Sequence, residues 1–182
     1  MARKETITQS DILQAAFEMV KEEGYENVTA RKLAARAGCS TQPIFRVYRN
    51  MEELLKELFF IAVDYFETYY ENFPKYNDIP FVDLGLTYIR FAEENKNLFR
   101  LLFLSKRRYE KSLYDLLNGK KGAVVREINY AKEYGCMSPE DMFTKMWIFI
   151  HGAACMTLTG DYDLEEIETV KLLEDSFRSF LK

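Results

Sequence analysis

The sequence predicts an all-α protein, and three observations support this fold class. Apolar residues recur at intervals of three and four positions along most of the chain, which is the period of one helix face. The 182 residues include 8 glycines and 4 prolines, too few for a sandwich of many short strands. No alternating strand pattern competes with the helical one. Hydrophobic residues make up 48% of the chain, which excludes intrinsic disorder and is enough for a full core.

The first two predicted helices have clear start and stop residues. The first runs from Thr8 to Glu23, and Gly24 ends it. Thr29 can cap a second helix over residues 30–37, since a threonine hydroxyl can accept a hydrogen bond from a backbone N–H of the first turn. Gly38 follows at the position where a helix commonly ends in the left-handed conformation.

Two further helices are predicted before Pro74. Ser40 can cap the third through the N–H of Gln42, and the side chains expected to point inward are Ile44, Phe45 and Tyr48. Asn50 and Glu53 have the spacing of a capping box at the start of the fourth. This fourth helix is long and reaches about residue 73.

The remainder of the chain is also predicted to be helical. Ser138, Pro139 and the acids that follow form a strong start, with a cap, a proline at the first position and negative charge in the first turn. Asp163 is expected to cap the last helix. The predicted helical stretches are 81–94, 97–104, 106–134 with an interruption near Gly119 and Gly122, 139–158, and 164 to the C-terminus.

Charge and aromatic residues divide the chain near residue 50. Residues 1–50 carry 8 Lys or Arg against 6 Asp or Glu, a net charge of +2, whereas residues 51–182 carry 17 against 23, a net charge of −6. The second part also holds 23 of the 27 aromatic residues. We therefore expect two domains, residues 1–50 and residues 51–182, joined by the long fourth helix.

A helix-turn-helix is predicted over about residues 30–49, where two helices are joined by a turn that contains glycine. If the apolar side of the second helix packs inward, Thr41, Gln42 and Arg46 face outward, as a helix in the DNA major groove requires. Arg46 can donate two hydrogen bonds to guanine, and Gln42 can pair in the same way with adenine. The helix start at Thr29 would offer backbone donors to phosphate. The alternative is a helical hairpin with a solvated basic face.

Five stretches carry a family resemblance through their order and spacing, namely 12–17, 24–25, 28–34, 37–40 and 44–55. With them, residues 7–55 resemble the DNA-binding domain of TetR/AcrR-type transcriptional regulators. The resemblance implies an all-helical chain of about nine helices. It further implies that the first three helices bind DNA, that the others form a ligand-binding and dimerisation domain, and that the protein acts as a dimer.

The chain departs from the family pattern at three positions that usually contact phosphates. Phe45 stands where the family commonly has Tyr, Val47 where it has Tyr or His, and Met51 where it has Lys. Tyr48 and Arg49 are the residues expected to take over those contacts. The predicted DNA-binding residues are Thr29, Thr41, Gln42, Arg46, Tyr48 and Arg49.

The aromatic second part predicts either a ligand pocket or an ordinary core. Trp147, His151 and Gly152 resemble the Trp-His-Gly (WHG) signature of one group of TetR-like C-terminal domains. Trp147 and His151 are four residues apart and share a helix face; His151 is either a ligand contact or a core histidine. The predicted ligand-binding residues are Phe59, Phe66, Tyr69, Tyr88, Tyr130, Trp147 and His151. The expected effector is a small, largely apolar molecule, neutral or cationic because the domain is acidic.

A homodimer is expected through the last two helices. They carry more apolar surface than two helices of a monomer need, and together with a second copy they can form a four-helix interface. The residues expected there are Ile148, Cys155, Ile167, Val170, Phe177 and Phe180. The small residues 152–154 would permit close approach of another helix.

Catalytic, metal and cofactor sites are not expected. A single histidine and three widely spaced cysteines do not form a metal-ligand pattern, and no phosphate-binding glycine loop is present. The odd number of cysteines fits a reducing cytoplasm. The polar start of the chain, Met1 to Glu5, does not resemble a signal peptide. The most apolar stretch, residues 146–158, is shorter than the ~20 residues of a membrane span.

These observations predict a cytoplasmic, homodimeric regulator without enzymatic activity. It would bind a double-stranded, pseudo-palindromic DNA operator and be released from it by a small molecule, most simply as a repressor. One alternative is a helical small-molecule-binding protein or enzyme whose helix-turn-helix no longer functions, which the residues at positions 45, 47 and 51 favour. Another is a scaffold that uses residues 1–50 to bind protein.

Overall fold

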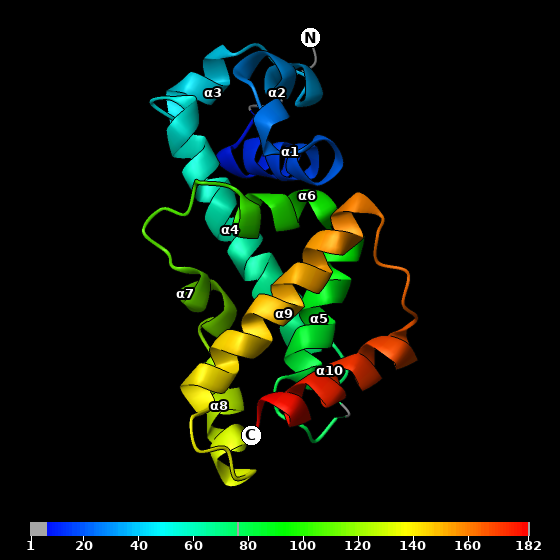
Figure 1. The fold of residues 1–182 in the computed structure, drawn as a ribbon. Coiled ribbons are helices and arrows are strands. Elements are labelled where there is room, and N and C mark those ends of the chain that lie inside the picture. The colour runs from blue at the N-terminus through cyan, green and yellow to red at the C-terminus, as the bar shows by residue number, and fades with distance from the viewer. Residues whose placement is uncertain (1–6, 76, 182) are drawn as a thin grey trace. The chain divides into compact units, whose positions relative to one another are not determined.

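The computed structural model describes residues 7–75 and 77–181, and in this part of the chain it contains helices and no strands. The all-α prediction is confirmed. The polar segment Met1 to Glu5 lies outside the described residues. The α-helices are α1 (Gln9–Glu23), α2 (Ala30–Arg36), α3 (Gln42–Val47), α4 (Met51–Asn72), α5 (Val82–Glu94), α6 (Lys96–Phe99), α7 (Leu113–Asn118), α8 (Ala123–Glu133), α9 (Pro139–Thr159) and α10 (Glu166–Phe180) (Figure 1).

The chain forms two compact units, each made of two separate segments. The first unit comprises residues 1–65 and 97–110, and the second comprises residues 66–96 and 111–182. The long helix α4 therefore contributes its N-terminal two thirds to one unit and its last residues to the other. These compact units are not the same as the predicted functional domains, residues 1–50 and 51–182. That division by function stays a prediction.

The first unit has a core built by α1, α2, α3 and the start of α4. A capping box opens α1, because the Thr8 hydroxyl accepts the Asp11 N–H at 3.1 Å and the Asp11 carboxylate accepts the Thr8 N–H at 2.8 Å. Helix α1 packs against both α2 and α3. The shared buried side chains are those of Ile12, Ala16, Val20, Leu33, Ala34, Ile44, Leu54 and Leu58.

Replacing Thr8 by alanine is expected to lower the free energy of unfolding by about 1 kcal/mol. The hydroxyl would no longer accept the N–H of Asp11, which would be left to water. For a chain of this length the corresponding fall in melting temperature is about 2–4 °C, measured by circular dichroism at constant protein concentration. Thr8→Ser is the control and should unfold close to the wild type, because serine caps a helix as well as threonine. An alanine variant as stable as the serine variant would show that the cap contributes nothing.

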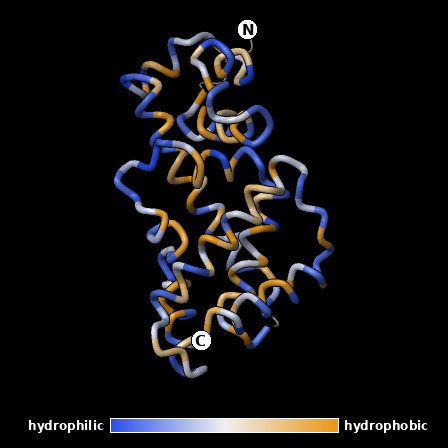
Figure 2. Tube along the Cα trace, in the orientation of Figure 1, coloured by the Kyte–Doolittle hydropathy of each residue, from blue (hydrophilic) through white to orange (hydrophobic). Residues whose placement is uncertain are grey.

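The second unit is organised around α5, which packs against α9 and α10. The closest approach is at Gly85, where a methyl group would lie 2.9 Å from Ile150 Cδ1 and 3.1 Å from Leu173 Cδ2. Glycine at this position lets the three helices meet. Gly152, where close approach of another helix is predicted, has no atom of another described helix within 4 Å of the place that a methyl group would take, so that prediction stays open. Apolar residues recur along the helices between hydrophilic ones, as the colouring in Figure 2 shows.

Two of the predicted helix caps are wrong. Helix α3 starts after Thr41, one residue later than a Ser40 cap implies, and within the described chain no side-chain hydrogen bond caps it. Helix α10 starts after Glu165, not at Asp163, because Glu165 and Glu168 form a capping box of their own. Asp163 and Glu165 are only two positions apart, and the sequence alone did not show which of them begins the helix.

The region between α5 and α8 differs most from the prediction. The expected helix over residues 97–104 is split into α6 and a π-helical turn, Arg100–Leu104, which is closed by the Ser105 N–H bonding to the Arg100 carbonyl at 2.9 Å. Residues 106–112 are not helical, although the predicted breaks near Gly119 and Gly122 are confirmed. Among the described residues, no helix is both long and apolar enough to cross a membrane.

Candidate nucleic-acid interface

Helix α3 has one buried and one exposed side. Ile44 is fully buried and Tyr48, which follows the helix one turn later, is almost so. Thr41, Gln42 and Arg46 are exposed, as predicted from the same pattern. None of the described residues forms an ion pair with Arg46, so its guanidinium is available to an outside partner.

The turn before α3 is shaped by Gly38, which has a φ of 66°. The Cys39 N–H donates to the Ala34 carbonyl at 2.9 Å, and the Gly38 N–H donates to the Ala35 carbonyl at 3.2 Å. These two bonds form a Schellman motif, which satisfies the last carbonyls of α2 and reverses the chain. The prediction that Gly38 ends this helix is confirmed, and the motif fixes where α3 begins.

Phe45 does not point inward as predicted, since 49% of its surface is exposed. Ile44 and Tyr48 are four residues apart and together occupy the inward face of the short helix. Each residue advances about 100° around a helix of 3.6 residues per turn, so Phe45 lies to one side of that face. The ring therefore stands beside Arg46 on the accessible side of α3.

Tyr48, predicted to contact phosphate, is held inside the first unit. Its hydroxyl donates to Glu57 Oε2 at 2.8 Å and accepts from Gln9 Nε2 at 3.3 Å. Burial, together with the hydrogen bond to Glu57, raises the pKa of Tyr48 to about 12. A phosphate could reach this hydroxyl only by displacing the carboxylate of Glu57. The phosphate contact of Tyr48 stays a prediction, and the structure favours a role in packing.

Two helix starts lie in the first unit beside exposed polar residues. The Thr29 hydroxyl accepts the Lys32 N–H at 3.3 Å, and the Asn50 side chain accepts the Glu53 N–H at 3.0 Å, so both predicted caps are confirmed. The Glu53 carboxylate accepts the N–H of Arg49, one residue before the position expected for a capping box. The Arg49 side chain is 89% exposed and lies 3.5 Å from Glu53.

Two other cations of the first unit, Lys32 and Arg36, are paired within the protein. Arg36 makes two hydrogen bonds to Glu22, at 2.6 and 2.7 Å, and Lys32 lies 3.3 Å from Glu23. The bond to Arg36 lowers the pKa of the Glu22 carboxyl. These pairs leave Arg46 and Arg49 better placed than Arg36 to meet a phosphate or a base.

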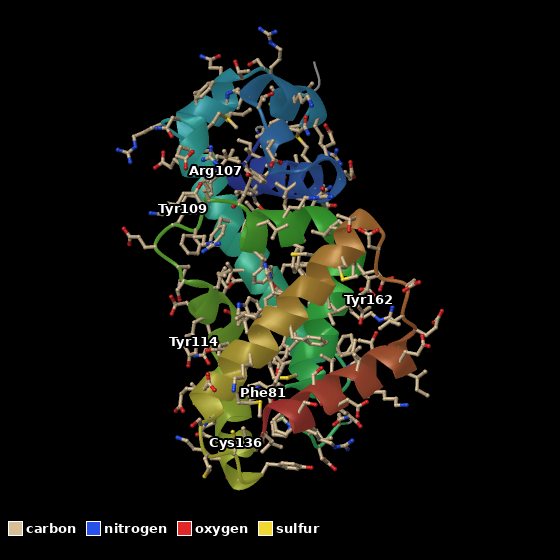
Figure 3. All side chains as sticks on the ribbon, viewed as in Figure 1. Phe81, Arg107, Tyr109, Tyr114, Cys136 and Tyr162 are labelled. Atoms are coloured by element: carbon tan, nitrogen blue, oxygen red, sulfur yellow. The ribbon has the colours of Figure 1, made fainter. Side chains whose placement is uncertain are left out.

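A contact that the sequence did not reveal connects residues 97–110 with the start of α4. The Glu52 carboxylate accepts hydrogen bonds from the Arg107 guanidinium and, at 2.9 Å, from the Tyr109 hydroxyl. Both bonds, that of Arg107 more strongly, lower the pKa of Glu52. Figure 3 labels Arg107 and Tyr109 at this place. Residues separated by more than 50 positions meet here, which no local pattern predicts.

The predicted ligand-binding residues are divided between the two units. Phe59 is buried in the first unit against Tyr109, with ring centroids 5.3 Å apart. The six others belong to the second unit. There the Tyr69 hydroxyl donates to Glu94 at 2.8 Å, and Tyr130 is exposed. Whether any of the seven contacts a ligand stays a prediction.

Four of these residues, Phe66, Tyr88, Trp147 and His151, form a packed aromatic cluster. The Tyr88 ring lies 6.3 Å from that of Phe66 and 4.9 Å from that of Trp147. The rings of Trp147 and His151 are stacked at 5.3 Å. His151 has Nδ1 3.0 Å from the Tyr88 hydroxyl and Nε2 3.7 Å from Cys155 Sγ. Both ring nitrogens therefore have partners, which agrees with the alternative of a core histidine.

The residues predicted at a dimer interface differ in how far they are exposed to solvent. Ile148 on α9 and Ile167 on α10 are 68% and 80% exposed, and Cys155, Val170 and Phe180 are part-exposed. Phe177 is fully buried, with its ring 6.3 Å from that of Phe81 and 5.6 Å from that of Tyr134. Phe177 therefore belongs to the core of the second unit rather than to a surface shared with a second copy.

Comparison with known proteins gives a family for one segment of the chain. Residues 12–58 match the model of the family described as bacterial regulatory proteins, tetR family. A search among curated proteins found no match.

The described fold is similar to those of solved TetR-family proteins. One from Vibrio parahaemolyticus is 20% identical with a TM-score of 0.66, covering 93% of this chain and 96% of that one. One from Rhodococcus sp. is 16% identical with a TM-score of 0.61, covering 95% and 98%. One from Mesorhizobium loti MAFF303099 is 18% identical with a TM-score of 0.56, covering 96% and 98%. The shared fold thus extends over nearly the whole chain, beyond the segment that matches the family model.

Proposed function

We propose that this chain, whose residues 12–58 match the tetR family of bacterial regulatory proteins, is a transcriptional regulator. It would bind a pseudo-palindromic DNA operator as a homodimer and be released from it by a small molecule. Binding of DNA and regulation of transcription follow from the family and the fold. The operator symmetry, the dimer and the response to a ligand are the finer parts of the proposal. A repressor is the simplest form of such a regulator.

The observation that carries the proposal is that α3 has one side buried in the first unit and one polar side exposed to solvent. Its inward side chains are buried in the first unit, whereas Thr41, Gln42 and Arg46 are exposed together. A recognition helix must present polar side chains from its N-terminal part to the base edges in the major groove. Helix α3 has this arrangement, and Arg46, which no described residue pairs with, supplies the planar donors that guanine accepts.

The exposed ring of Phe45 fits the same function. An apolar side chain on a recognition helix can contact the methyl group of thymine, which is one of the features that distinguish base pairs in the major groove. We propose that Phe45 makes such a contact next to the base read by Arg46. The departure from the family pattern at this position would then change the preferred DNA sequence instead of abolishing binding.

Selection of bound fragments from random double-stranded DNA tests the proposal directly. The expected result is enrichment of an inverted repeat whose half-sites are separated by about one helical turn, ~34–36 Å from centre to centre. Binding of the selected site should be at least ~1,000-fold tighter than binding of unrelated DNA at the same salt concentration. Failure to enrich any sequence would favour the alternative of a small-molecule-binding protein with an inactive helix-turn-helix.

Replacing Arg49 by alanine is expected to weaken binding of all DNA sequences to a similar extent. Its exposed guanidinium is proposed to contact phosphate, which is present at every base pair. The slope of log affinity against log salt should become shallower by about one unit for each phosphate that the variant no longer neutralises. Arg36→Ala is the control, because Arg36 is already engaged by Glu22 and its removal should change the slope little. Equal slopes for the wild type and the Arg49 variant would contradict the phosphate contact.

The proposed dimer rests on exposed apolar side chains of α9 and α10. Ile148 and Met156 on α9 and Ile167 on α10 are all accessible, although side chains of this kind are usually buried. Gly152 lies on α9 between the first two and has open space beside it. A second copy could cover these residues and approach α9 closely at the glycine. Sedimentation should show a dimer at micromolar concentration, and a monomer would remove both this part of the proposal and the operator symmetry.

A further inference from the structure

A cavity of about 610 Å³ lies in the second unit, between the end of α4, the loop before α5, the first turn of α5, and α8. All its lining residues belong to this one unit. Its volume is within the ~300–1,000 Å³ typical of small-molecule sites. Of the seven ligand-binding residues predicted from the sequence, only Tyr130 lines it. Figure 3 labels Phe81, the residue that precedes α5 at this cavity.

The walls of this cavity combine two tyrosine rings with an excess of acid. Four carboxylates line it, Glu71, Asp78, Asp83 and Glu127, against the two cations Lys75 and Arg126. Glu71 is balanced by Lys121 at 3.2 Å and by Arg126 at 3.7 Å. Arg126 also acts on Glu127, so the two cations of the lining are shared among four carboxylates, and the cavity attracts positive charge.

Asp83 and Glu127 are held in place by backbone donors. The Asn77 N–H donates to Asp83 Oδ2 at 3.3 Å, and the Phe81 N–H donates to Glu127 Oε2 at 2.9 Å. Burial raises the pKa of Glu127, and the charge of Asp83 raises it further, although Phe81, Arg126 and Lys75 oppose the shift. Two carboxylates that repel each other in a part-buried site are stabilised when a cation enters.

The side chain of Lys75 shows how an ammonium group fits this cavity. Its Nζ lies 3.7 Å from the centre of the Tyr70 ring, which is the geometry of a cation–π contact. The same nitrogen donates to the Tyr70 carbonyl at 2.7 Å and to the Thr87 hydroxyl at 3.4 Å. Burial lowers the pKa of Lys75, while the charges of Asp83, Glu127 and Glu71 act against this shift. The ammonium is thus partly removed from water and stabilised by an aromatic face, two oxygens and nearby acids.

Lys75 is attached to the loop between α4 and α5 by a flexible stem of four methylene groups. Because its ammonium group is held in the cavity only by this stem and by non-covalent bonds, another ammonium group can replace it at modest cost. The lysine nitrogen then returns to water, where its charge is well hydrated. Ile79, Pro80 and Tyr130 also line the cavity and offer apolar surface to the body of a ligand.

We propose that this cavity binds a small organic ammonium ion. Its charged nitrogen takes the place of Lys75 Nζ on the Tyr70 ring, near Asp83 and Glu127, and its apolar part lies along Ile79, Pro80 and Tyr130. A role for this ion as the effector rests on the proposed function, whereas its binding does not.

Three compounds of similar shape and different charge test the binding on the full-length protein. Protonated 2-phenylethylamine is the cation, 2-phenylethanol is its neutral counterpart, and 3-phenylpropionate is the anion. In isothermal titration calorimetry the amine should bind at least tenfold more tightly than the alcohol, and the anion should give no measurable heat. Equal binding of amine and alcohol, or binding of the anion alone, would overturn the proposal.

Substitutions of residues that line the cavity test which side chains bind the amine. Lys75→Met removes the internal ammonium but keeps the length of the side chain, and it should tighten amine binding at least fivefold. Asp83→Asn keeps an oxygen for the Asn77 N–H but removes the charge, and it should weaken amine binding at least fivefold. The control is Glu93→Gln, an exposed acid on α5 that pairs with Arg90 outside this cavity and should bind like the wild type. If the Lys75→Met protein binds the amine as the wild type does, or more weakly, the ligand nitrogen does not take the place of Lys75 Nζ. This conclusion holds even if Asp83→Asn fails to fold.

Titration of the selected operator with and without saturating 2-phenylethylamine separates the two proposals. An effector that couples to the DNA site should change operator affinity by at least fivefold. Protein that binds operator but no amine overturns the cavity proposal alone. Protein that binds the amine but no DNA overturns the proposed function alone. Binding of both without any change in operator affinity removes the effector role and confirms the site.

Discussion

Replacing Arg46 by alanine is expected to weaken operator binding by roughly five- to 150-fold for each half-site and to relax base preference at one position. The physical reason is the removal of two parallel hydrogen bonds to one guanine, about 1–3 kcal/mol, where ~1.4 kcal/mol corresponds to a factor of ten. Arg46 is exposed and forms no ion pair with the described residues, so thermal unfolding should change little. Fluorescence anisotropy with the selected site, followed by a second selection with the variant, measures both effects.

The matched control is Arg46→Lys, which keeps the positive charge and removes the planar pair of donors. If Arg46 reads guanine, the lysine variant should retain much of its affinity for unrelated DNA and lose part of its base preference. If Arg46 only adds charge near phosphate, the lysine variant should behave like the wild type. An alanine variant with unchanged affinity and unchanged base preference would show that α3 is not the recognition helix.

Replacing Phe177 by alanine is expected to lower the free energy of unfolding by about 3–5 kcal/mol. Its ring is fully buried between those of Phe81 and Tyr134, so truncation leaves a cavity among aromatic side chains. At about 2–4 °C for each kcal/mol, the melting temperature should fall by roughly 6–20 °C. The fall should be seen at every protein concentration, because the cavity forms inside one copy of the chain.

Ile167→Glu is the contrasting variant on the same helix. With 80% of its surface exposed, Ile167 supports little of the fold within one copy, so the variant should remain folded. A charge in an apolar dimer interface would nevertheless be desolvated without a partner, and dissociation at micromolar concentration should be visible by sedimentation. If the Glu variant is as dimeric as the wild type, α10 does not contribute Ile167 to the interface. If Phe177→Ala dissociates the dimer without any fall in melting temperature, its placement in the core is wrong.

The sequence predicted the fold class and the first helices because their determinants are local. Thr8, Thr29 and Asn50 cap helices through donors within three residues, and Gly38 is needed because its backbone has a positive φ. Each of these choices can be recognised from a few neighbouring residues. The start of α10 was predicted at the wrong residue for the opposite reason, since adjacent acids can serve equally well as caps.

The exposed and buried sides of α3 were predicted only in part, because a helix of six residues completes fewer than two turns. Ile44 and Tyr48 were correctly assigned to the inward face, whereas Phe45 was assigned there on its hydrophobicity alone. Tyr48 was expected at phosphate because its hydroxyl is polar. Its partner Glu57 follows on another helix, and the sequence does not show that the two meet.

The position of the cavity of the second unit could not be predicted from the sequence, which pointed to only one of its lining residues, Tyr130. Its defining contact, the Lys75 ammonium on the Tyr70 ring, involves neighbours in sequence, but the acids around it come from α5 and α8. Tertiary packing brings Asp83 and Glu127 near each other, although they are separated by 43 intervening positions. Some of the aromatic residues that did stand out in the sequence, Tyr88 and Trp147 among them, form a packed cluster, in which the Tyr88 hydroxyl is hydrogen-bonded to His151.

The first unit is built from two separate segments of the chain, which limits how the protein can be cut into folded fragments. Residues 97–110 belong to this unit, and Leu98, Phe99, Leu101, Leu102 and Phe103 are buried. The chain passes from one unit to the other three times, so no single cut separates them. A fragment ending after α4 would lack this segment and expose the apolar surface that it covers. Exchange of the first unit with that of a similar protein should therefore succeed only when the segment corresponding to residues 97–110 is exchanged as well.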